Sequence, residues 1–460
     1  MNYQHLKQLI EEHKVIHLCG IGGVSMRALA RLLQQMGATV QGSDRDHSPA
    51  VAMLRRQDIT VYIGHSAQQL GNAALVIRTA AVPDSNPEIE EAHRRGLPVL
   101  ERAQAWGLLM QGYNHALCVA GTHGKTSTTS MLTEVLLCAH MDPTVMVGGE
   151  LPMIGGSLRI GAKDLFVAEA CEYRNSFLSF LPTIAILLNI ERDHLDFFSS
   201  TDDIIHSFHR FACLVPEEEG LVVANGEDPH VEKAVTGCNR RIIRFGLEPR
   251  WDVYPQNVEV NLGYYSFDII CFGEFYCRAT LQVPGKHNMK NALAAAAACH
   301  ALGVSGKAFA AGLGGYTGVG RRFERKGTFQ GAVIYDDYAH HPDEIIATLK
   351  TAKSMGYDRV ICVFQPHTYS RTQSLFEEFA KALSYADIAV LTEIYAARET
   401  NVNHISSKSL ADRIPGAVFT PTLPEAAEFI RRQARPGDLI FTMGAGDIYK
   451  LFDMLPHEEV

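Results

Sequence analysis

The feature that most constrains the fold is an alternation of short apolar runs with helical stretches. Between Val15 and about Trp106, the β-rich runs are VIHLC, TVQGS, ITVYI, ALVIR and LPVLE. Stretches such as MRALARLLQQMG and NPEIEEAHRRG lie between them and have the pattern of helices. Alternation of this kind is typical of a parallel sheet that is covered by helices. The first part of the chain is therefore predicted to be a Rossmann-like domain.

The alternation begins again twice. Near Leu117 the strand LCVAG opens a second set, which continues through DLFVAEA, TIAILLNI, a β-rich stretch near residues 242–283 and the helix NMKNALAAAAACHALG. A glycine-dense segment from Gly312 to Glu324 is predicted to be a linker. Beyond it, AVIYDDYAHH, RVICVFQPH, DIAVLTEIY and DLIFTMGAG form a third set. We predict an α/β protein of three domains: a Rossmann-like domain (1–107), a central P-loop ATPase-type mixed sheet (108–320) and a C-terminal Rossmann-like domain (321–460).

Length and charge narrow the class of protein. The 460 residues exceed what one hydrophobic core usually organises. The net charge of −9, without a basic stripe, argues against nucleic acid as a partner. The N-terminal MNYQHLKQLIEEHK predicts an amphipathic helix rather than a signal peptide, and no apolar run reaches the roughly 20 residues that cross a bilayer. We expect a cytoplasmic protein, monomeric or homodimeric, that does not bind membranes and keeps its ten cysteines reduced.

The glycine cluster IHLCGIGGVSM follows the first strand. Gly20 and Gly22, with Asp44 after the second strand, partly match the fingerprint of dinucleotide-binding proteins. The last glycine of that fingerprint is replaced by Ser25, so the match is weak evidence for a nicotinamide cofactor. The N-terminus of a helix that begins after such a loop can hold another diphosphate instead.

A second cluster, Gly121 to Thr126 (GTHGKT), lies between the strand LCVAG and a helix. Small residues let backbone N–H groups face phosphate oxygens, Lys125 reaches the terminal phosphates, and the Thr126 hydroxyl suits a magnesium ion. The common pattern has another glycine where this chain has Val119, so the loop is a variant. We predict a nucleoside triphosphate site here.

Acidic residues follow two further strands, in AEACEY and NIERDHLD. Carboxylates at such positions hold metal ions that neutralise a transferred phosphoryl group. Because magnesium prefers oxygen ligands, the chemistry alone favours Glu169, Asp193 or Asp196 over His194. In the third region, DDYAHHP and QPHTYSRT follow strands, and Arg371 suits bidentate recognition of a carboxylate or phosphate.

These motifs, in this order, resemble those of the Mur ligase family. The resemblance runs from about Val15 to Lys450, through GIGGVSM, GSD, GTHGKTST, EACEY, NIERDHLD, GKHNMKNALAA, RRFE, DDYAHHP, FQPHTYSRT and GAGDI. It implies ATP-dependent ligation of L-alanine to the lactyl carboxylate of UDP-N-acetylmuramate through an acyl phosphate. The products would be UDP-N-acetylmuramoyl-L-alanine, ADP and phosphate, and the reaction would serve peptidoglycan precursor synthesis. ATP and Mg²⁺ are the implied cofactors.

The resemblance also implies roles for individual residues. The triphosphate would be bound by Gly121, Thr122, His123, Gly124, Lys125, Thr126 and Ser127, and magnesium by Thr126, Glu169 and His194. Asn291 would contact adenine, Arg322 a phosphate and Asp337 the ribose. Tyr338, His340, His367 and Arg371 would form the amino-acid end of the site, and Gly20, Ile21, Gly22, Gly23 and Asp44 would hold the uridine diphosphate. The implied catalytic residues are Lys125, Glu169, His194, Arg322 and His340.

The chain departs from the family pattern in two places. Cys171 replaces an acid of the usual EADES, and Thr368 stands where many members have arginine. No lysine lies between His194 and Lys233, although ligases that add later residues use a carbamylated lysine there. Three alternatives remain open: a recycling ligase that joins a ready-made tripeptide to the same nucleotide, a dinucleotide-dependent oxidoreductase, and a nonenzymatic nucleotide-binding switch.

Overall fold

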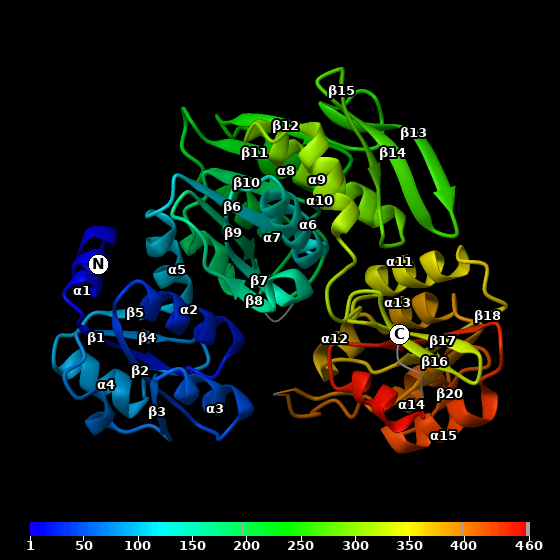
Figure 1. Cartoon of the computed structure of the whole chain (residues 1–460). Helices are drawn as coiled ribbons and strands as arrows, with labels where there is room; N and C mark the ends of the chain where they lie inside the picture. Colours follow the sequence, from blue (N-terminus) through cyan, green and yellow to red (C-terminus); the bar gives the residue numbers. More distant parts are fainter. Residues whose placement is uncertain (195–196, 398, 457–460) are drawn as a thin grey trace. The chain divides into compact units, whose positions relative to one another are not determined.

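The computed structural model describes residues 1–194, 197–397 and 399–456 (Figure 1). The chain divides into two compact units, Met1–Glu191 with Thr201–Arg244, and Arg192–Ser200 with Phe245–Val460. The predicted boundaries after residues 107 and 320 do not coincide with this division and stay predictions. Each unit is described by itself.

The first unit begins with a five-stranded sheet in the order β3-β2-β1-β4-β5, and all of its pairings are parallel. Its strands are β1 (Val15–Cys19), β2 (Thr39–Asp44), β3 (Thr60–Ile63), β4 (Leu75–Arg78) and β5 (Val99–Glu101). Its helices are α1 (Tyr3–Glu11), α2 (Val24–Gln35), α3 (Pro49–Arg56), η1 (Ala67–Leu70), α4 (Pro87–Arg94) and α5 (Arg102–Met110). The predicted parallel sheet is confirmed, and the N-terminal amphipathic segment is a helix.

The first unit also holds most of the central sheet, in the order β12-β11-β10-β6-β9-β7-β8. The strands are β6 (His115–Ala120), β7 (Thr144–Leu151), β8 (Gly156–Arg159), β9 (Leu165–Ala170), β10 (Ile184–Leu187), β11 (Leu221–Asn225) and β12 (Arg241–Phe245). The helices are α6 (Lys125–Cys138), η2 (Pro152–Ile154), η3 (Tyr173–Ser179), α7 (Thr201–Ala212) and α8 (Pro229–Val235). Because β8 pairs antiparallel to β7 while β6 pairs parallel to β9 and β10, the sheet is mixed, as predicted.

The second unit opens with an antiparallel meander, β13 (Val253–Asn261), β14 (Tyr264–Cys271) and β15 (Glu274–Thr280), followed by α9 (Lys286–Ala301) and α10 (Gly306–Gly315). The glycine-dense linker prediction is wrong at its start, because Gly312 to Gly315 belong to α10. Ser305 caps this helix, and Phe309 and Leu313 are buried, so packing overrides the low helix propensity of glycine. The connection to the last sheet begins at Tyr316.

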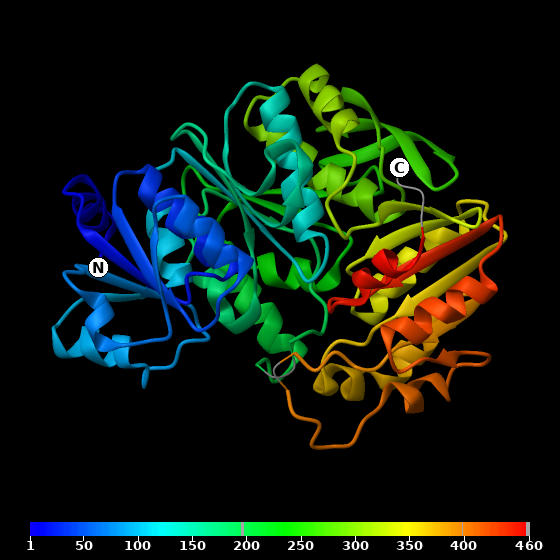
Figure 2. The same cartoon turned by 60° about the horizontal axis from the view of Figure 1, so that its bottom comes forward.

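The last sheet has the order β16-β17-β21-β18-β19-β20, with only the β16 pairing antiparallel. Figure 2 shows the red end of the chain beside the yellow strands that precede it, which is the position of β21 between β17 and β18. The strands are β16 (Glu324–Phe329), β17 (Ala332–Asp337), β18 (Arg359–Phe364), β19 (Ile388–Leu391), β20 (Val418–Phe419) and β21 (Asp438–Met443). The helices are α11 (Pro342–Lys353), α12 (Tyr369–Ser374), α13 (Phe376–Leu383), α14 (Ser407–Ala411), α15 (Leu423–Gln433) and η4 (Ile448–Met454).

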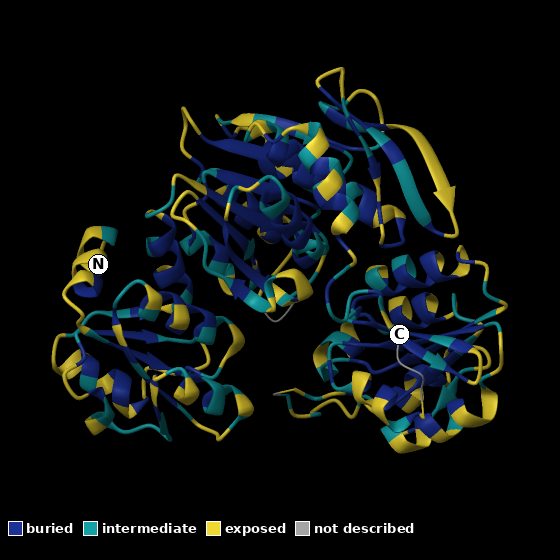
Figure 3. Cartoon of the chain, viewed as in Figure 1, coloured by how far each residue is buried: buried dark blue, intermediate teal, exposed yellow. Residues whose placement is uncertain are grey.

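The parallel strands at the centre of the three sheets are largely buried, whereas β13 and β15 are mostly exposed or half-buried (Figure 3). Burial of the parallel strands is expected for sheets that are covered by helices. The ten cysteines are free thiols, as predicted, and seven of them are buried, among them Cys118, Cys299 and Cys362. Within the described part of the chain, no helix has the length and apolarity to span a bilayer.

Candidate functional site

The second glycine loop joins the central strand β6 to helix α6. Gly121 has φ +150°, and a Cβ there would lie 2.9 Å from Leu188 Cβ, so the loop accepts only glycine at this position. Gly124 has φ +84° and is the N-cap of α6. No side chain of the described residues caps that helix, which leaves the first-turn N–H groups as anion donors. The predicted loop is therefore built as an anion-binding helix terminus.

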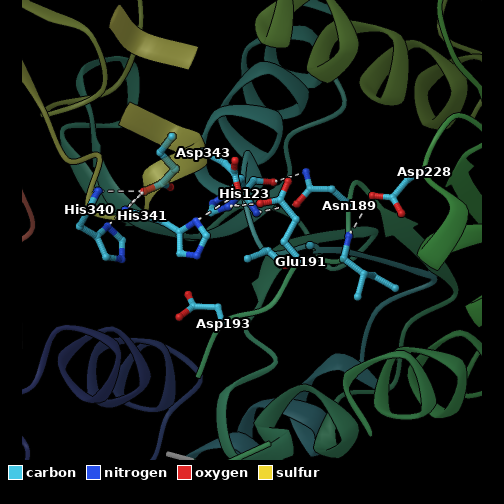
Figure 4. A network of polar contacts seen from close by, with 12 residues as sticks. His123, Asn189, Glu191, Asp193, Asp228, His340, His341 and Asp343 are labelled. Atoms are coloured by element: carbon cyan, nitrogen blue, oxygen red, sulfur yellow. Dashed lines mark hydrogen bonds and ion pairs between the residues drawn. The ribbon is translucent and has the colours of Figure 1, made fainter. Parts of the chain in front are cut away.

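The end of β10 holds this loop in place (Figure 4). The Asn189 side chain accepts a hydrogen bond from the His123 amide at 2.8 Å and donates one to the His123 carbonyl at 3.0 Å. The Glu191 amide donates to Thr122 Oγ1 at 2.8 Å, and its carboxylate lies 2.9 Å from His123 Nε2. Asn189 and Glu191 were not predicted as site residues, although their motif NIERDHLD was noted. Their side chains fix the geometry of the loop.

Lys125 is bound by its own loop and by a buried acid. Its Nζ donates to the carbonyls of Gly121 and Thr122 and forms an ion pair with Glu172 Oε2 at 3.1 Å. Burial by itself lowers the pKa of Lys125, but the charge of Glu172, with smaller contributions from Cys171 and Glu169, leaves that pKa raised. Lys125 is therefore a fixed cation. Sequence reasoning missed Glu172, which is 2% exposed, and the signal was the second acid of EACEY.

The predicted ligands of the triphosphate and of magnesium in the first unit lie at this loop or on the adjacent strand β9. Thr126 is buried in the first turn of α6, and Ser127 follows it half-buried. Glu169 is the penultimate residue of β9, and its Oε1 accepts a hydrogen bond from the Gly148 amide at 2.6 Å. The oxygen ligands of Thr126 and Glu169 suit magnesium in chemistry. Their role as metal ligands stays a prediction.

The second unit contains the residues after NIER. Asp193 accepts a hydrogen bond from Arg371 Nη2 at 3.2 Å and one from the His194 amide at 2.7 Å. Burial raises the pKa of Asp193, but Arg371 and His194 outweigh it and hold that pKa well below its usual range. Asp193 is thus paired with Arg371, and the assignment of His194 as a metal ligand stays a prediction. Asp196 lies outside the described residues.

Two neutral histidines lie beside Arg371 and Glu344. His340 Nδ1 lies 3.0 Å from the Tyr338 carbonyl, which can only accept, so this nitrogen carries the proton and Nε2 is left as an acceptor. Burial lowers the pKa of both His340 and His367 to about 4. Arg371 Nη1 lies 3.4 Å from His367 Nδ1. The Tyr338 and His340 rings lie 5.3 Å apart, and the His340 and His367 rings 6.2 Å apart, so the structure brings together all four residues predicted for the amino-acid end.

Glu344 connects two predicted residues of this unit, His340 and Arg322, and sequence reasoning missed it. Its carboxylate accepts a hydrogen bond from the His340 amide at 3.0 Å and lies 3.7 Å from Arg322 Nη1. The Arg322 guanidinium lies over the Tyr338 ring, 5.0 Å from its centroid. The signal for Glu344 was its place in the first turn of α11, three residues after the N-cap His341.

Asp337 and Asn291 make contacts that their predicted roles did not include. The Asp337 carboxylate accepts hydrogen bonds from the Phe323 amide at 2.8 Å and the Ala339 amide at 2.7 Å. Burial raises the pKa of Asp337 to about 6, against the opposing charge of Arg322. Asn291 is buried on α9 and donates to Asn288 Oδ1 at 3.3 Å. The ribose and adenine contacts stay predictions.

The first glycine loop follows β1 and is closed by its own hydrogen bonds. The Gly20 and Ile21 amides both donate to the Ser43 carbonyl, at 2.8 and 3.0 Å. The Gly22 amide donates to Asp44 Oδ2 at 2.8 Å, and the Gly23 amide to the Gly20 carbonyl at 3.3 Å. Gly23 is the N-cap of α2, and no side chain in the described ranges caps that helix. Donors for an anion are therefore the first-turn amides of α2.

Models of known protein families match nearly the whole chain, including both glycine loops. Family models match residues 15–114 (Mur ligase family, catalytic domain), 119–299 (Mur ligase middle domain) and 321–446 (Mur ligase, glutamate ligase domain). The chain belongs to the Mur ligase family. This Mur ligase is 45% identical over 448 residues to the UDP-N-acetylmuramate–L-alanine ligase of Acetivibrio thermocellus, covering 96% of this chain and 95% of the relative. It is 42% identical to the enzyme of the same name from Clostridium novyi, with 99% of each chain covered.

Solved structures agree with the three-domain α/β fold. The UDP-N-acetylmuramate-alanine ligase of Thermotoga maritima matches this Mur ligase with a TM-score of 0.79 at 30% identity, covering 96% of this chain and 98% of that one. A murein peptide ligase from Psychrobacter arcticus matches with a TM-score of 0.70 at 26% identity, over 96% and 98% of the two chains. The second similarity is the one expected for the recycling alternative, and it is weaker in both measures.

Proposed function

We propose that this Mur ligase joins L-alanine to the lactyl carboxylate of UDP-N-acetylmuramate at the expense of ATP. The observation that carries the proposal is 40–46% identity over at least 95% of the chain to a series of enzymes with that activity, among them those of Lachnospira eligens and Clostridium botulinum. The loop Gly121–Thr126 with its fixed lysine supports the ATP part. Two uncapped helix termini, at α2 and α6, support the binding of two separate phosphate groups.

The chemistry follows from the poor reactivity of a carboxylate as an acyl donor. A lactyl carboxylate oxygen attacks the γ-phosphorus of ATP, the bond to the bridging oxygen breaks, and ADP leaves. The amine nitrogen of L-alanine then attacks the carbonyl carbon, expels phosphate and loses a proton. Catalysis of such steps is mainly positioning and stabilisation of charge. Lys125 supplies a fixed positive charge for the terminal phosphates.

The residues of the second unit suit the amino-acid substrate. Arg371 carries a planar fork suited to carboxylates, and although its Nη2 donates to Asp193, its other N–H groups can reach the carboxylate of the amino acid. The neutral His340 offers Nε2 as an acceptor for the amine, because its Nδ1 hydrogen points to the Tyr338 carbonyl. Mg²⁺ is the expected cofactor, with Thr126, Glu169 and His194 as its ligands, and when bound it neutralises negative charge on the phosphates. These assignments remain proposals.

A coupled assay of ADP release tests the proposal. Purified protein is given ATP, Mg²⁺ and UDP-N-acetylmuramate, with L-alanine, L-serine, glycine or the murein tripeptide as the acceptor. We expect the largest kcat/KM with L-alanine and no turnover without the nucleotide sugar. Turnover that depends on the tripeptide would establish the recycling reaction instead. A titration with NADH is the control for the oxidoreductase alternative, and we expect no saturable binding.

A further inference from the structure

A cavity of about 270 Å³ lies inside the first unit, between the five-stranded sheet and the central sheet. Its walls come from the first turns of α2 and α5, from β7 and from the end of β9. The Trp106 indole donates to Ser25 Oγ at 3.2 Å, and Ser25 Oγ donates to Met146 Sδ at 3.7 Å, which ties three of these walls together. Glu169 lies on the wall next to the second glycine loop.

Arg102 is the only residue with a positively charged side chain among the described residues that line this cavity. It is the first residue of α5, and its guanidinium has no ion pair or hydrogen bond within the described part of the chain. The neighbouring carboxylate of Glu101 lies 3.8 Å from Arg78 instead. Burial lowers the pKa of Arg102, and Cys171 and Glu101 offset this only in part. A half-buried guanidinium that no protein carboxylate pairs with leaves its fork of N–H donors available to an anionic ligand in the cavity.

The lining of the cavity includes residues from both regions where phosphate is expected. Val24 and Ser25 belong to the first turn of α2, where the diphosphate of the nucleotide sugar is proposed to bind. Glu169 and Cys171 also line the cavity, and both influence the pKa of Lys125. Cys171 also influences the pKa of Arg102, so it lies within electrostatic reach of both cations. A nucleotide sugar whose diphosphate lies at α2 can extend its carboxylate through this cavity towards Glu169.

We infer that Arg102 binds the lactyl carboxylate of UDP-N-acetylmuramate and presents it to the γ-phosphate of ATP. This inference rests on the proposed function and adds to it a residue that selects the acidic sugar. The guanidinium fork accepts a carboxylate in a bidentate geometry and reduces its repulsion by the phosphates of ATP. The same positive charge stabilises the oxyanion that forms when the amine attacks the carbonyl carbon.

Two nucleotide sugars separate a carboxylate contact from a phosphate contact. UDP-N-acetylglucosamine has the same diphosphate and acetamido sugar as UDP-N-acetylmuramate but lacks the lactyl carboxylate. The Kd of each is measured by calorimetry for the wild type, Arg102→Ala and Arg102→Lys. The chain has two tryptophans, so Trp106 fluorescence in a Trp251→Phe background gives a second readout from the cavity wall. Arg56→Ala is the matched control, because Arg56 is an exposed arginine on α3 of the same sheet domain.

We expect Arg102→Ala to weaken binding of UDP-N-acetylmuramate by roughly tenfold to a hundredfold, the range for hydrogen bonds to charged groups. Arg102→Lys should have an intermediate effect. UDP-N-acetylglucosamine should bind both variants and the wild type within about twofold, and the Kd of ADP should not change, which reports that the variants are folded. Equal weakening for both sugars would assign Arg102 to the diphosphate, and unchanged binding of UDP-N-acetylmuramate would overturn the inference. Failure of the wild type to bind UDP-N-acetylmuramate would instead refute the proposed function.

Discussion

The two glycine loops of this Mur ligase follow parallel strands in neighbouring sheets and open helices α2 and α6, yet they are held in different ways. In the first loop, the Gly20, Ile21 and Gly22 amides are bound by Ser43 and Asp44, which belong to the adjacent strand β2. In the second loop, amides are bound by Asn189, which follows the adjacent strand β10, and a lysine is added. Only the second loop carries a positive charge of its own.

If the proposed function holds, the same local arrangement of strand, glycine loop and helix serves two phosphate groups of different chemistry. The first loop offers only uncapped helix amides, which suit a diphosphate that is bound but does not react. The second loop adds Lys125, and a phosphoryl group that is transferred needs such a fixed charge. The strands that precede the loops differ too. β6 is apolar and buried from Ala116 to Ala120, whereas β1 carries the buried His17 beside Glu88.

The largest effect is expected from removing the charge of the second loop. Lys125→Ala should lower kcat for ADP release by about 10³-fold or more, because a single charged group at a phosphoryl-transfer centre contributes on that scale. Binding of UDP-N-acetylmuramate, measured by calorimetry, should stay within twofold of the wild type. Lys163→Ala, which removes an exposed lysine of the same unit, is the control. If the sugar nucleotide were lost as well, the two loops would not be independent.

The charge buried beneath the first loop should matter for stability rather than for chemistry. Glu88 is fully buried, accepts a hydrogen bond from Ser43 at 2.6 Å and lies 3.4 Å from His17 Nε2. Glu88→Ala should therefore lower the free energy of unfolding by about 3 kcal/mol, the cost of leaving one member of a buried pair alone. Urea unfolding measures this, with Glu90→Ala on the exposed side of α4 as the control.

The same carboxylate should make stability depend on pH. Burial raises the pKa of Glu88, but hydrogen bonds from His17 and Ser43 outweigh it and lower that pKa to about 2. A group whose pKa is depressed in the folded state stabilises the protein above its unfolded pKa, here near 4.5. The difference in stability between wild type and Glu88→Gln should therefore shrink as the pH falls from about 4.5 towards 2. A difference that is constant over this range would show that Glu88 is neutral when folded.

The sequence predicted what is encoded locally. The β6 strand, the GTHGKT loop and the α6 helix are consecutive, so their pattern was sufficient to predict the structure, while the nucleotide site assigned to the loop stays a prediction. The ion pair of Lys125 with Glu172 joins residues 47 positions apart, and no pattern in the sequence specifies that pairing. Asp337 was predicted from its motif, but the structure places both of its oxygens on backbone amides. The hydrogen-bond partner of a polar side chain depends on how helices and strands pack against one another, and the periodicity of the sequence does not specify that packing.

Substituting one glycine in each loop should affect the Kd of one ligand only, and the affected ligand should differ between the two loops. The effects should be smaller than those above. Gly20 has φ +77°, and a Cβ there would lie 2.6 Å from Thr79 Cγ2, while Gly121 has φ +150° and is closed in by Leu188. Each alanine variant should cost about 1–3 kcal/mol through backbone strain and displacement of its loop. Gly20→Ala should raise the Kd of UDP-N-acetylmuramate and leave that of ADP unchanged, and Gly121→Ala should do the reverse. A rise in both constants for either variant would contradict separate sites.

The smallest effect is expected at Asp44, which accepts a hydrogen bond from the Gly22 amide. Substitutions there test whether Asp44 fixes the first loop or contacts the substrate. If Asp44 serves to fix the loop, Asp44→Asn keeps an acceptor for the Gly22 amide and should raise the KM for UDP-N-acetylmuramate less than threefold. Asp44→Ala removes the acceptor and should raise that KM by about fivefold to tenfold, which corresponds to one hydrogen bond of about 1 kcal/mol. If Asp44 instead contacts the substrate through its charge, both variants should lose affinity alike. Steady-state kinetics with saturating ATP and L-alanine distinguish these outcomes. If Asp44 only fixes the loop, Asp44→Asn keeps the KM for UDP-N-acetylmuramate low although the carboxylate is gone, and if its charge contacts the substrate, it does not.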